Sequence, residues 1–304
     1  MLDFTVNRIA IAVAVAVTVS IVSFLLLHLS GDLAVAMAGP EASPQQVAAV
    51  RTQFGLDRPL AVQYAEWVWN AIHLNFGRSF YFREDVSKLI AERFPVTITL
   101  GLLALGMALV IGIPLGVVAA LNRDTWIDRL AMLVCVLGQA MPSFWFSLML
   151  VSVFSVSFRW LPVSGNATWR HFILPATALG YYAMPAMMRL TRAGMLDVLS
   201  ADYIRTARAK GLPRRKIVIR HALRNAIIPV VALTAVQFGF LLGGSIVIEA
   251  VFSLQGLGQL AWDSISRNDF PVVQSIVLVL ATIYVALSMV ADLLNGMLDP
   301  RLRP

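Results

Sequence analysis

The sequence predicts an all-α membrane protein with six transmembrane helices. Apolar residue types make up 59% of its 304 residues and charged types only 13%, about half the share that is usual in soluble domains. So few charges cannot cover a water-soluble surface of this size. The net charge of +7 is concentrated in one short loop between apolar stretches, which favours membrane topology over nucleic-acid binding as its cause.

Six apolar stretches approach or exceed the ~20 residues that a helix needs to cross a bilayer. The first is read as a retained helix, because a cleaved signal peptide would have a shorter apolar core. Two glycine pairs, Gly101 with Gly106 and Gly112 with Gly116, are expected to pack against neighbouring helices. The expected spans are Ile9–Leu29, Thr97–Leu121, Leu130–Val156, Phe172–Met188, Ala226–Ile248 and Val272–Leu294.

The basic residues predict the orientation of the chain. Ten of the 24 Lys and Arg residues fall between Arg189 and Arg224, whereas the short loops on the other side of the membrane hold few. Because short cytoplasmic loops carry the excess of Lys and Arg, both termini are expected in the cytoplasm of a bacterial cell.

The outer loop after the first span is expected to have helices of its own. Ser43 and Pro44 form a helix start and Gly55 its end, and an amphipathic stretch, Leu60–Leu74, carries two tryptophans suited to interfacial anchoring. Asp85–Phe94 is expected to lie on the membrane surface before the second span. These features divide the chain into residues 1–93 and a five-helix core at 94–298.

The loop from Asp202 to Arg224 predicts two short helices joined by a turn. Gly211 supplies a left-handed residue that ends the first helix, Pro213 follows it, and the second helix begins near Arg214. Helical spacing puts Tyr203, Ala207 and Lys210 on one face. A basic loop that merely contacts anionic lipid would explain the arginines, but a docking element for a cytoplasmic partner also explains the ordered helix and its turn.

At these residues the sequence resembles the type I ABC importer permeases, in particular the B subunits of the peptide and nickel branch, including those for glutathione. The same resemblance continues at Gly55-Leu56-Asp57, at His221-Ala222-Leu223-Arg224-Asn225-Ala226, at Leu242-Gly243-Gly244-Ser245 and at Gly256-Leu257-Gly258. In this family, a motif in a cytoplasmic loop couples the permease to its ATPase, and it generally starts with Glu-Ala-Ala. This sequence has Arg205-Thr206-Ala207 at that place, as in the peptide branch. The ATPase-coupling residues that the resemblance implies are Asp202, Tyr203, Arg205, Thr206, Ala207, Arg208, Ala209, Lys210, Gly211 and Leu212.

The resemblance also implies partners. These are a second homologous permease, two ATPase subunits that bind ATP and Mg, and an extracytoplasmic solute-binding protein. The chain itself lacks a phosphate-binding loop, because Met107 and Ala108 follow its spaced glycines instead of Lys and Ser or Thr. It is therefore expected to be neither an enzyme nor a binder of cofactor, metal or nucleic acid.

A passage for cargo is expected to be lined by weakly polar, adaptable side chains. Ordinary helix packing remains an alternative explanation for each candidate, and the segment from Gly256 to Phe270 is either a contact for the binding protein or a re-entrant gate. The candidates are Gln139, Met141, Ser143, Gln237, Ser245 and Glu249.

The expected function is that of a permease subunit in an ATP-driven, binding-protein-dependent importer for short peptides, dipeptides or glutathione. A nickel chelate or another small solute is the alternative cargo. A secondary transporter is disfavoured by the scarcity of intramembrane charge, and a membrane scaffold that transports nothing remains a third class.

Overall fold

In a computed structural model that describes residues 2–29, 31–39 and 42–298, the regular elements are helices, apart from one isolated β-bridge between Arg78 and Asp85. The α-helices are α1 (Leu2–Leu29), α2 (Leu33–Ala38), α3 (Pro44–Gln53), α4 (Leu60–Ile72), α5 (Val86–Leu121), α6 (Trp126–Ala140), α7 (Ser143–Leu150), α8 (Ile173–Ser200), α9 (Asp202–Ala209), α10 (Arg214–Lys216), α11 (Arg224–Ala226), α12 (Ile228–Phe252), α13 (Leu257–Ser266) and α14 (Phe270–Leu298). Two π-helices, η1 (Val151–Ser157) and η3 (Ile217–Leu223), and one 3-10 helix, η2 (Trp169–Phe172), complete them.

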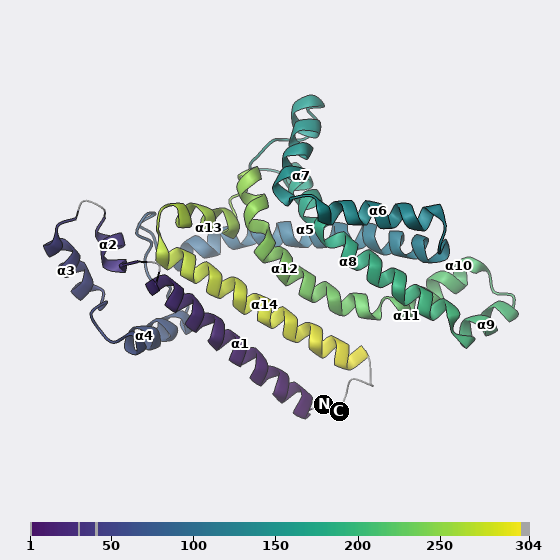
Figure 1. Cartoon of the computed structure of the whole chain (residues 1–304), viewed down its shortest axis with the longest axis horizontal. Coiled ribbons are helices and arrows are strands. Elements are labelled where there is room, and N and C mark those ends of the chain that lie inside the picture. The colour runs from purple at the N-terminus through teal and green to yellow at the C-terminus, as the bar shows by residue number, and fades with distance from the viewer. Residues whose placement is uncertain (1, 30, 40–41, 299–304) are drawn as a thin grey trace.

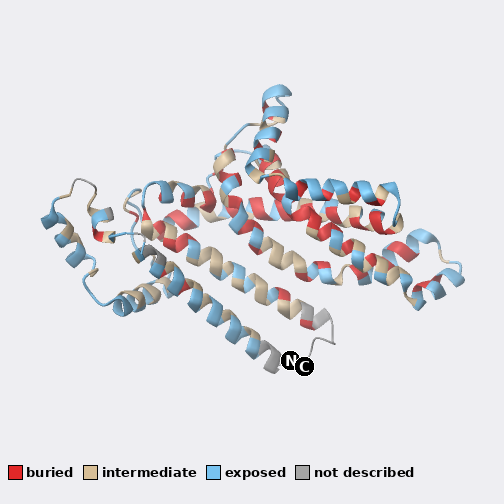
Figure 2. Ribbon diagram, in the orientation of Figure 1, coloured by how far each residue is buried: buried red, intermediate tan, exposed pale blue. Residues whose placement is uncertain are grey.

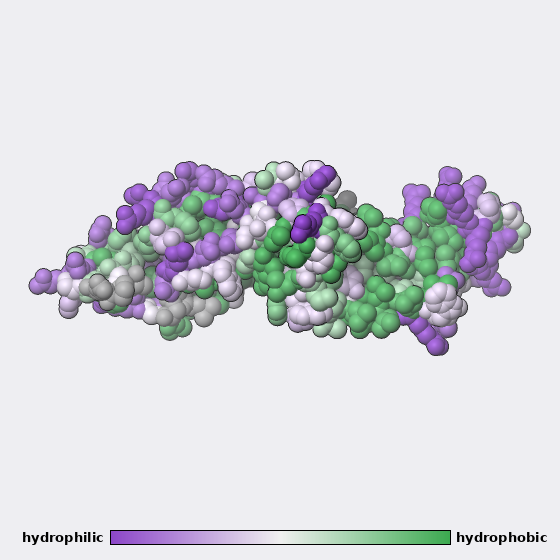
Figure 3. Space-filling view, turned by 90° about the horizontal axis from the view of Figure 1, so that it is seen from above, coloured by the Kyte–Doolittle hydropathy of each residue, from purple (hydrophilic) through white to green (hydrophobic). Residues whose placement is uncertain are grey.

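The long helices form an elongated bundle with different elements at its two ends (Figure 1). One end carries α2, α3, α4 and α13, and the other carries α9 and α10. Helices α1 and α14 run antiparallel, and Arg8 of α1 pairs with Asp292 of α14 at 3.0 Å, so the start of α1 and the end of α14 lie at the same end. Hydrophilic residues gather mainly towards the two ends, and hydrophobic residues dominate between them (Figure 3).

Helices α5 and α8 form the centre of the bundle, and each carries more buried residues than any other described helix (Figure 2). Their backbones approach closely because small residues face each other. A Cβ on Gly116 would lie 2.6 Å from the carbonyl oxygen of Met188, and one on Gly180 would lie 2.6 Å from that of Ala104. The packing expected of Gly112 and Gly116 is therefore confirmed, whereas a Cβ on Gly106 would meet nothing within 4 Å.

The expected third span is not one continuous helix. The chain bends by 105° between α6 and the α7–η1 segment, and α7 with η1 projects from the side of the bundle (Figure 1). The break falls at Met141 and Pro142, where Met141 takes an extended backbone with φ −90° and ψ 135°. A residue before proline is pushed out of the helical region. Pro142, which lies inside the apolar stretch expected to form one span, therefore ends α6.

Within the described residues, four helices are long and apolar enough to cross a membrane, or five if the bent pair counts as one span. The sequence predicted six. The difference lies in α8, which covers the expected span Phe172–Met188 and is 28 residues long but carries Arg189, Arg192 and Asp197 in its second half.

The outer helices were predicted correctly, but the surface segment was not. Ser43 caps α3 with a reciprocal hydrogen-bonded pair to Gln46, and Gly55 follows it with φ +64°. In contrast, the expected surface-lying Asp85–Phe94 forms the first turns of α5 itself. Its apolar face, including fully buried Val86, packs on Leu257 and Val272 at the start of α13 and α14, so burial against the protein replaces contact with the membrane surface.

Candidate functional site

The segment 202–212 protrudes at the end of the bundle opposite α2–α4 (Figure 1). Helix α8 ends at Ser200 and α9 follows after a single linking residue. Gly211 takes φ +70° and its N–H donates to the carbonyl of Arg208 at 2.9 Å, which is the left-handed ending that glycine favours. Pro213 then starts α10, and the chain continues through η3 and α11 into α12. The predicted helix, turn and second helix are confirmed.

The inner face of α9 is packed on its own chain. Ile204 is fully buried and Ala207 is 7% exposed, and both belong to a cluster with Met195, Ile217 and Ala222. The expectation that Ala207 projects together with Tyr203 and Lys210 is therefore wrong. The small side chain of Ala207 instead lets α9 sit closely on η3.

The outer face of α9 is exposed and mainly basic. Its tyrosine is held in place, because the Asn225 side-chain amide donates to the Tyr203 hydroxyl at 2.8 Å, and Arg205 pairs with Asp202 at 3.4 Å. The exposed residues of the segment are Asp202, Tyr203, Arg205, Thr206, Arg208, Ala209, Lys210 and Gly211, and Leu212 is half-buried. A rigid base therefore presents an ordered, positively charged surface.

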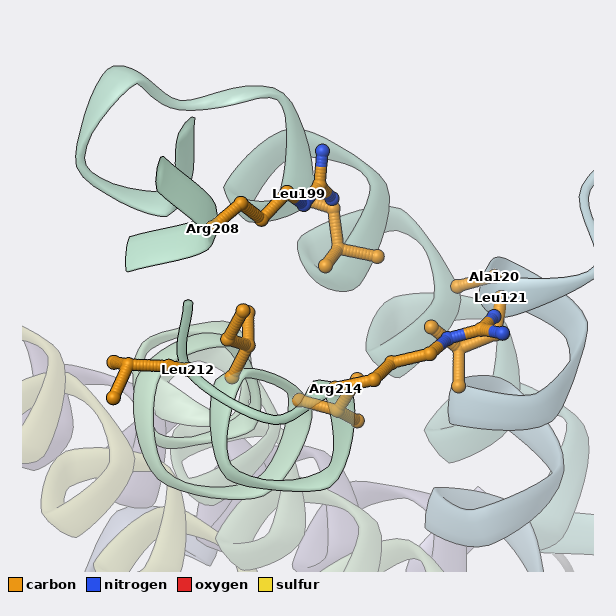
Figure 4. Close-up of a pocket in the computed structure, with 8 residues that line it drawn as sticks. Ala120, Leu121, Leu199, Arg208, Leu212 and Arg214 are labelled. Carbon is orange, nitrogen blue, oxygen red and sulfur yellow. The ribbon is translucent and has the colours of Figure 1, made fainter. Parts of the chain in front are cut away.

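A cavity of about 460 Å³ separates the end of α9 from the ends of α5 and α8. Its lining is apolar apart from two arginines, and it includes Ala120 and Leu121 from α5 and Leu199 from α8. Figure 4 shows the Arg214 side chain extending towards Ala120 and Leu121, and Arg208 near Leu199. The segment is thus joined to the bundle through η3 on one side and is open on the other.

A bidentate ion pair lies at the same end of the bundle. Arg192 of α8 donates through Nε and one terminal nitrogen to the two carboxylate oxygens of Asp128 on α6, both at 2.7 Å. The Asp128 side chain is 7% exposed and that of Arg192 is 24% exposed. Sequence reasoning counted Arg192 among the basic residues that set topology and missed its partner, although a lone acid near the start of an apolar stretch is a signal for one.

The pathway candidates fall in different places. Gln139, Met141 and Ser143 lie at the bend between α6 and α7, and Gln237 is half-buried on α12. Ser245 and Glu249 are fully buried and hydrogen-bonded to each other at 2.9 Å.

Glu249 ties three helices together. Besides Ser245, its carboxylate accepts from the Thr97 hydroxyl of α5 at 2.8 Å and from the N–H groups of Gly258 and Gln259 at 2.7 and 3.1 Å. Thr97 in turn accepts from the N–H of Leu257 at 2.8 Å. An anionic group at the N-terminus of a helix accepts from the free N–H groups and is attracted by the positive end of the helix dipole, so this carboxylate fixes the start of α13.

A second buried carboxylate fixes the outer loop. Asp269, before α14, is 1% exposed and accepts from the Ser79 hydroxyl and from the N–H groups of Phe80 and Tyr81 at 3.3 and 3.2 Å. Arg267 stacks over the Tyr81 ring at 3.9 Å from its centre. The loop before α5 is therefore attached to the α13–α14 corner, a contact across about 190 residues that no local pattern reveals.

The described residues contain no group of three or more His, Cys, Asp or Glu that could hold a metal ion.

Comparison with known proteins agrees with this arrangement. Residues 112–304 match the family model described as the inner membrane component of binding-protein-dependent transport systems, and residues 1–101 match the model for the N-terminal part of such components. The chain is 42% identical over 304 residues to the glutathione transport system permease protein GsiC of Escherichia coli (strain K12), covering 100% of this chain and 99% of that protein. It is also 42% identical over 312 residues to a protein of Brucella abortus (strain 2308) with the provisional name of peptide transport system permease protein, with the same coverage.

Two solved structures share the fold. A chain of the inward-facing MetNI methionine ABC transporter matches with a TM-score of 0.59 and 18% identity, over 69% of this chain and 96% of that one. A chain of an amino acid ABC transporter solved with histidines matches with a TM-score of 0.52 and 17% identity, over 71% and 95%. The two family models and the full-length relatives together place this chain in the family of binding-protein-dependent transport system inner membrane components, as a multi-pass permease and not an enzyme.

Proposed function

We propose that this permease belongs to an ATP-driven importer of short peptides, including glutathione, and that segment 202–212 receives the motion of the ATPase subunits. The observation that carries the proposal is the construction of the segment. Its inner face is buried on η3 and its outer face is exposed and basic. It follows α8 after one linking residue and leads through α10, η3 and α11 into α12. A push on α9 would therefore be transmitted to two long helices of the bundle.

The full-length identity to permeases named for glutathione and for peptides supports the cargo class. A nickel chelate or another small solute is the alternative cargo. In the proposed assembly, a second homologous permease completes the passage, two ATPase subunits bind ATP and Mg, and an extracytoplasmic protein delivers the cargo. Gln139, Met141, Ser143, Gln237, Ser245 and Glu249 are kept as the proposed pathway residues. The first four are the candidates for direct contact with the cargo, because Ser245 and Glu249 are fully buried in this chain.

The proposed topology has six spans, with α8 as the fourth, and both termini in the cytoplasm. Helix α8 lies at the centre of the bundle, where its Arg192 is paired with Asp128 of α6, whereas Arg189 and Asp197 are exposed. A span that is shielded by protein needs less apolar surface than one that faces lipid. The division into residues 1–93 and a core at 94–298 is kept as part of this proposal, with α5 running unbroken across the boundary.

Two substitutions at one position test the coupling role. Gly211→Pro cannot take φ +70°, because the proline ring fixes φ near −65°, and it also removes the N–H that donates to Arg208. We expect it to abolish cargo-dependent uptake in cells while the protein still inserts and assembles. Gly211→Asn is the matched control, since asparagine tolerates the left-handed region and a Cβ there meets nothing within 4 Å.

Uptake of radiolabelled dipeptide or glutathione in a strain that lacks the chromosomal importer would measure both variants. Normal uptake by Gly211→Pro would contradict the coupling assignment. Uptake driven by an ion gradient alone, with ATPase subunits deleted, would instead identify a secondary transporter, and unchanged uptake on deletion of the permease would identify a scaffold.

A further inference from the structure

We propose that a groove between α1, α4 and α14 binds one acyl chain of a membrane phospholipid. The groove has a volume of about 490 Å³, within the range of pockets that enclose small ligands. Ala16 and Ser20 of α1 form one wall, Tyr64 and Trp67 of α4 a second, and Val279 and Thr282 of α14 a third. Figure 1 shows α4 beside the end of α1 that lies away from the N-terminus.

The lining is suited to a hydrocarbon. It contains no charged residue, and the hydroxyl groups that it does contain are already bonded within the protein. Ser20 donates to the carbonyl of Val17 at 2.8 Å and shares a hydrogen bond with Tyr64 at 2.7 Å, while Thr282 donates to the carbonyl of Leu278 at 2.7 Å. A peptide cargo would bury its charged termini there without a partner, at a large cost, and water would find few partners.

The groove also lies at the depth of acyl chains. The residues that α14 contributes, Leu278 to Ile283, follow its first residue by eight to thirteen positions. At 1.5 Å per residue they lie roughly 12 to 20 Å from the start of the helix, well inside a hydrocarbon layer about 30 Å thick.

The surface around the groove is apolar and exposed, as a surface that contacts lipid must be. Only 11% of the most apolar window of α1, and of α14, is buried inside the protein. Along α1, apolar side chains such as Val13 and Val22 are 57% and 47% exposed. Through this apolar surface an acyl chain can enter the groove from the surrounding bilayer without crossing a polar barrier.

Helix α4 forms a fixed wall of the groove rather than a loose one. His28 of α1 and Gln63 of α4 are hydrogen-bonded at 3.2 Å, and the Phe24 ring lies 5.4 Å from that of Tyr64 and 6.1 Å from that of Trp67. Tyrosine and tryptophan are typical of positions where protein, acyl chain and headgroup meet. We infer that the bound chain fills the space beneath α4 and holds this outer helix against α1 and α14.

Filling the groove from either wall provides the first test. Ala16→Phe and Ala71→Phe place a ring in the groove from α1 and from α4, and both alanines line it. The matched controls are Ala14→Phe and Ala65→Phe, which lie on the same helices at exposed positions outside the lining.

Each importer, purified with its partner subunits, would be washed extensively in mild detergent, and its retained phospholipid counted by quantitative mass spectrometry. We expect the wild type and both controls to keep one phospholipid per chain that both groove variants lose. Equal lipid content in all five proteins would overturn the proposal. Loss of the second permease from the groove variants, with lipid content unchanged, would also overturn it and identify the groove as a protein interface.

A second measurement needs no variant that fills the groove. Importers in bilayers of phosphatidylethanolamine brominated on its acyl chains are transferred to unbrominated lipid, and tryptophan fluorescence is followed. The part of the fluorescence that is lost in Trp67→Phe is the signal of a tryptophan in the groove. The part that is lost in Trp69→Phe is the signal of a tryptophan that is 66% exposed. Quenching of Trp67 that persists after the bulk lipid has been replaced supports a bound chain, and recovery of Trp67 together with the bulk lipid contradicts it.

Discussion

At the scale of single residues, buried carboxylates determine how the helices meet. Glu249 accepts four hydrogen bonds from α5, α12 and the start of α13, and these leave its carboxylate no open side. A Cβ on Gly256 or Gly258 would collide with it, so the backbone must pass close to the acid. The sequence placed Glu249 among the pathway residues because an acid in an apolar span is a functional candidate by default, and only the fold reveals its donors.

Two substitutions of Glu249 separate its shape from its charge. Glu249→Ala leaves the N–H groups of Gly258 and Gln259 without their acceptor, and each buried donor in that state costs about 1–3 kcal/mol. We expect a loss of about 2–4 kcal/mol in thermal unfolding of the purified importer. Glu249→Gln keeps an oxygen for those N–H groups, and we expect it to lose less than half as much. Equal loss in both variants would show that the negative charge, not the hydrogen bonding, holds α13.

The ion pair between Asp128 and Arg192 is a second determinant at this scale. Each single reversal, Asp128→Arg or Arg192→Asp, places two like charges where one bidentate pair now lies, and breaking a buried pair costs about 3–5 kcal/mol. Because the Arg192 side chain is 24% exposed, we expect the lower end of that range. The double reversal is expected to recover at least half of the lost thermal stability. If the double variant is as unstable as the sum of the singles, the two side chains do not act as a pair.

At the scale of elements, close contact between α5 and α8 organises the bundle. Gly116→Ala and Gly180→Ala each drive a methyl group against a backbone carbonyl at 2.6 Å, and a backbone cannot yield as a flexible side chain does. Overpacking of this kind typically costs about 1–3 kcal/mol.

Gly106→Ala is the matched control on α5, since its Cβ meets nothing within 4 Å and alanine favours helix over glycine. We expect the first two variants to lower the unfolding temperature of the importer, and Gly106→Ala to leave it unchanged or raise it slightly. A control that destabilises as much as the other two would refute the packing explanation.

The elements that the sequence predicted are those with a local cause. Ser43 with Pro44 marks the start of one helix and Gly211 with Pro213 marks the end of another, each within a few residues, and the structure has both ends. The failures depend on contacts that are distant in sequence. The apolar face of Val86 and Leu89 indicated a surface helix, but it is buried on α13 and α14. The bend at Pro142 is the exception, because its cause is local: proline keeps the preceding Met141 out of the helical region.

At the scale of the whole molecule, the hydrophilic residues lie mainly towards the two ends of the bundle (Figure 3). The pair Arg8–Asp292 places the start of α1 beside the end of α14, and Figure 1 shows α9 towards that end and α3 at the other. The positive-inside rule assigns the end with the basic segment to the cytoplasm. The arrangement of the ends follows from the structure, whereas which of them faces the cytoplasm comes from the distribution of arginine and lysine in the sequence.

Cysteine labelling tests that orientation directly. Cys135, which is 1% exposed, is the single cysteine of the chain, so Cys135→Ser gives a background without reactive thiols. Gln45→Cys on α3 and Lys210→Cys after α9 then mark two exposed positions at opposite ends. In intact spheroplasts, a membrane-impermeant maleimide is expected to label the first and to reach the second only after the membrane is opened. Labelling of Lys210→Cys in intact spheroplasts would place segment 202–212 outside the cell, where no ATPase subunit could reach it.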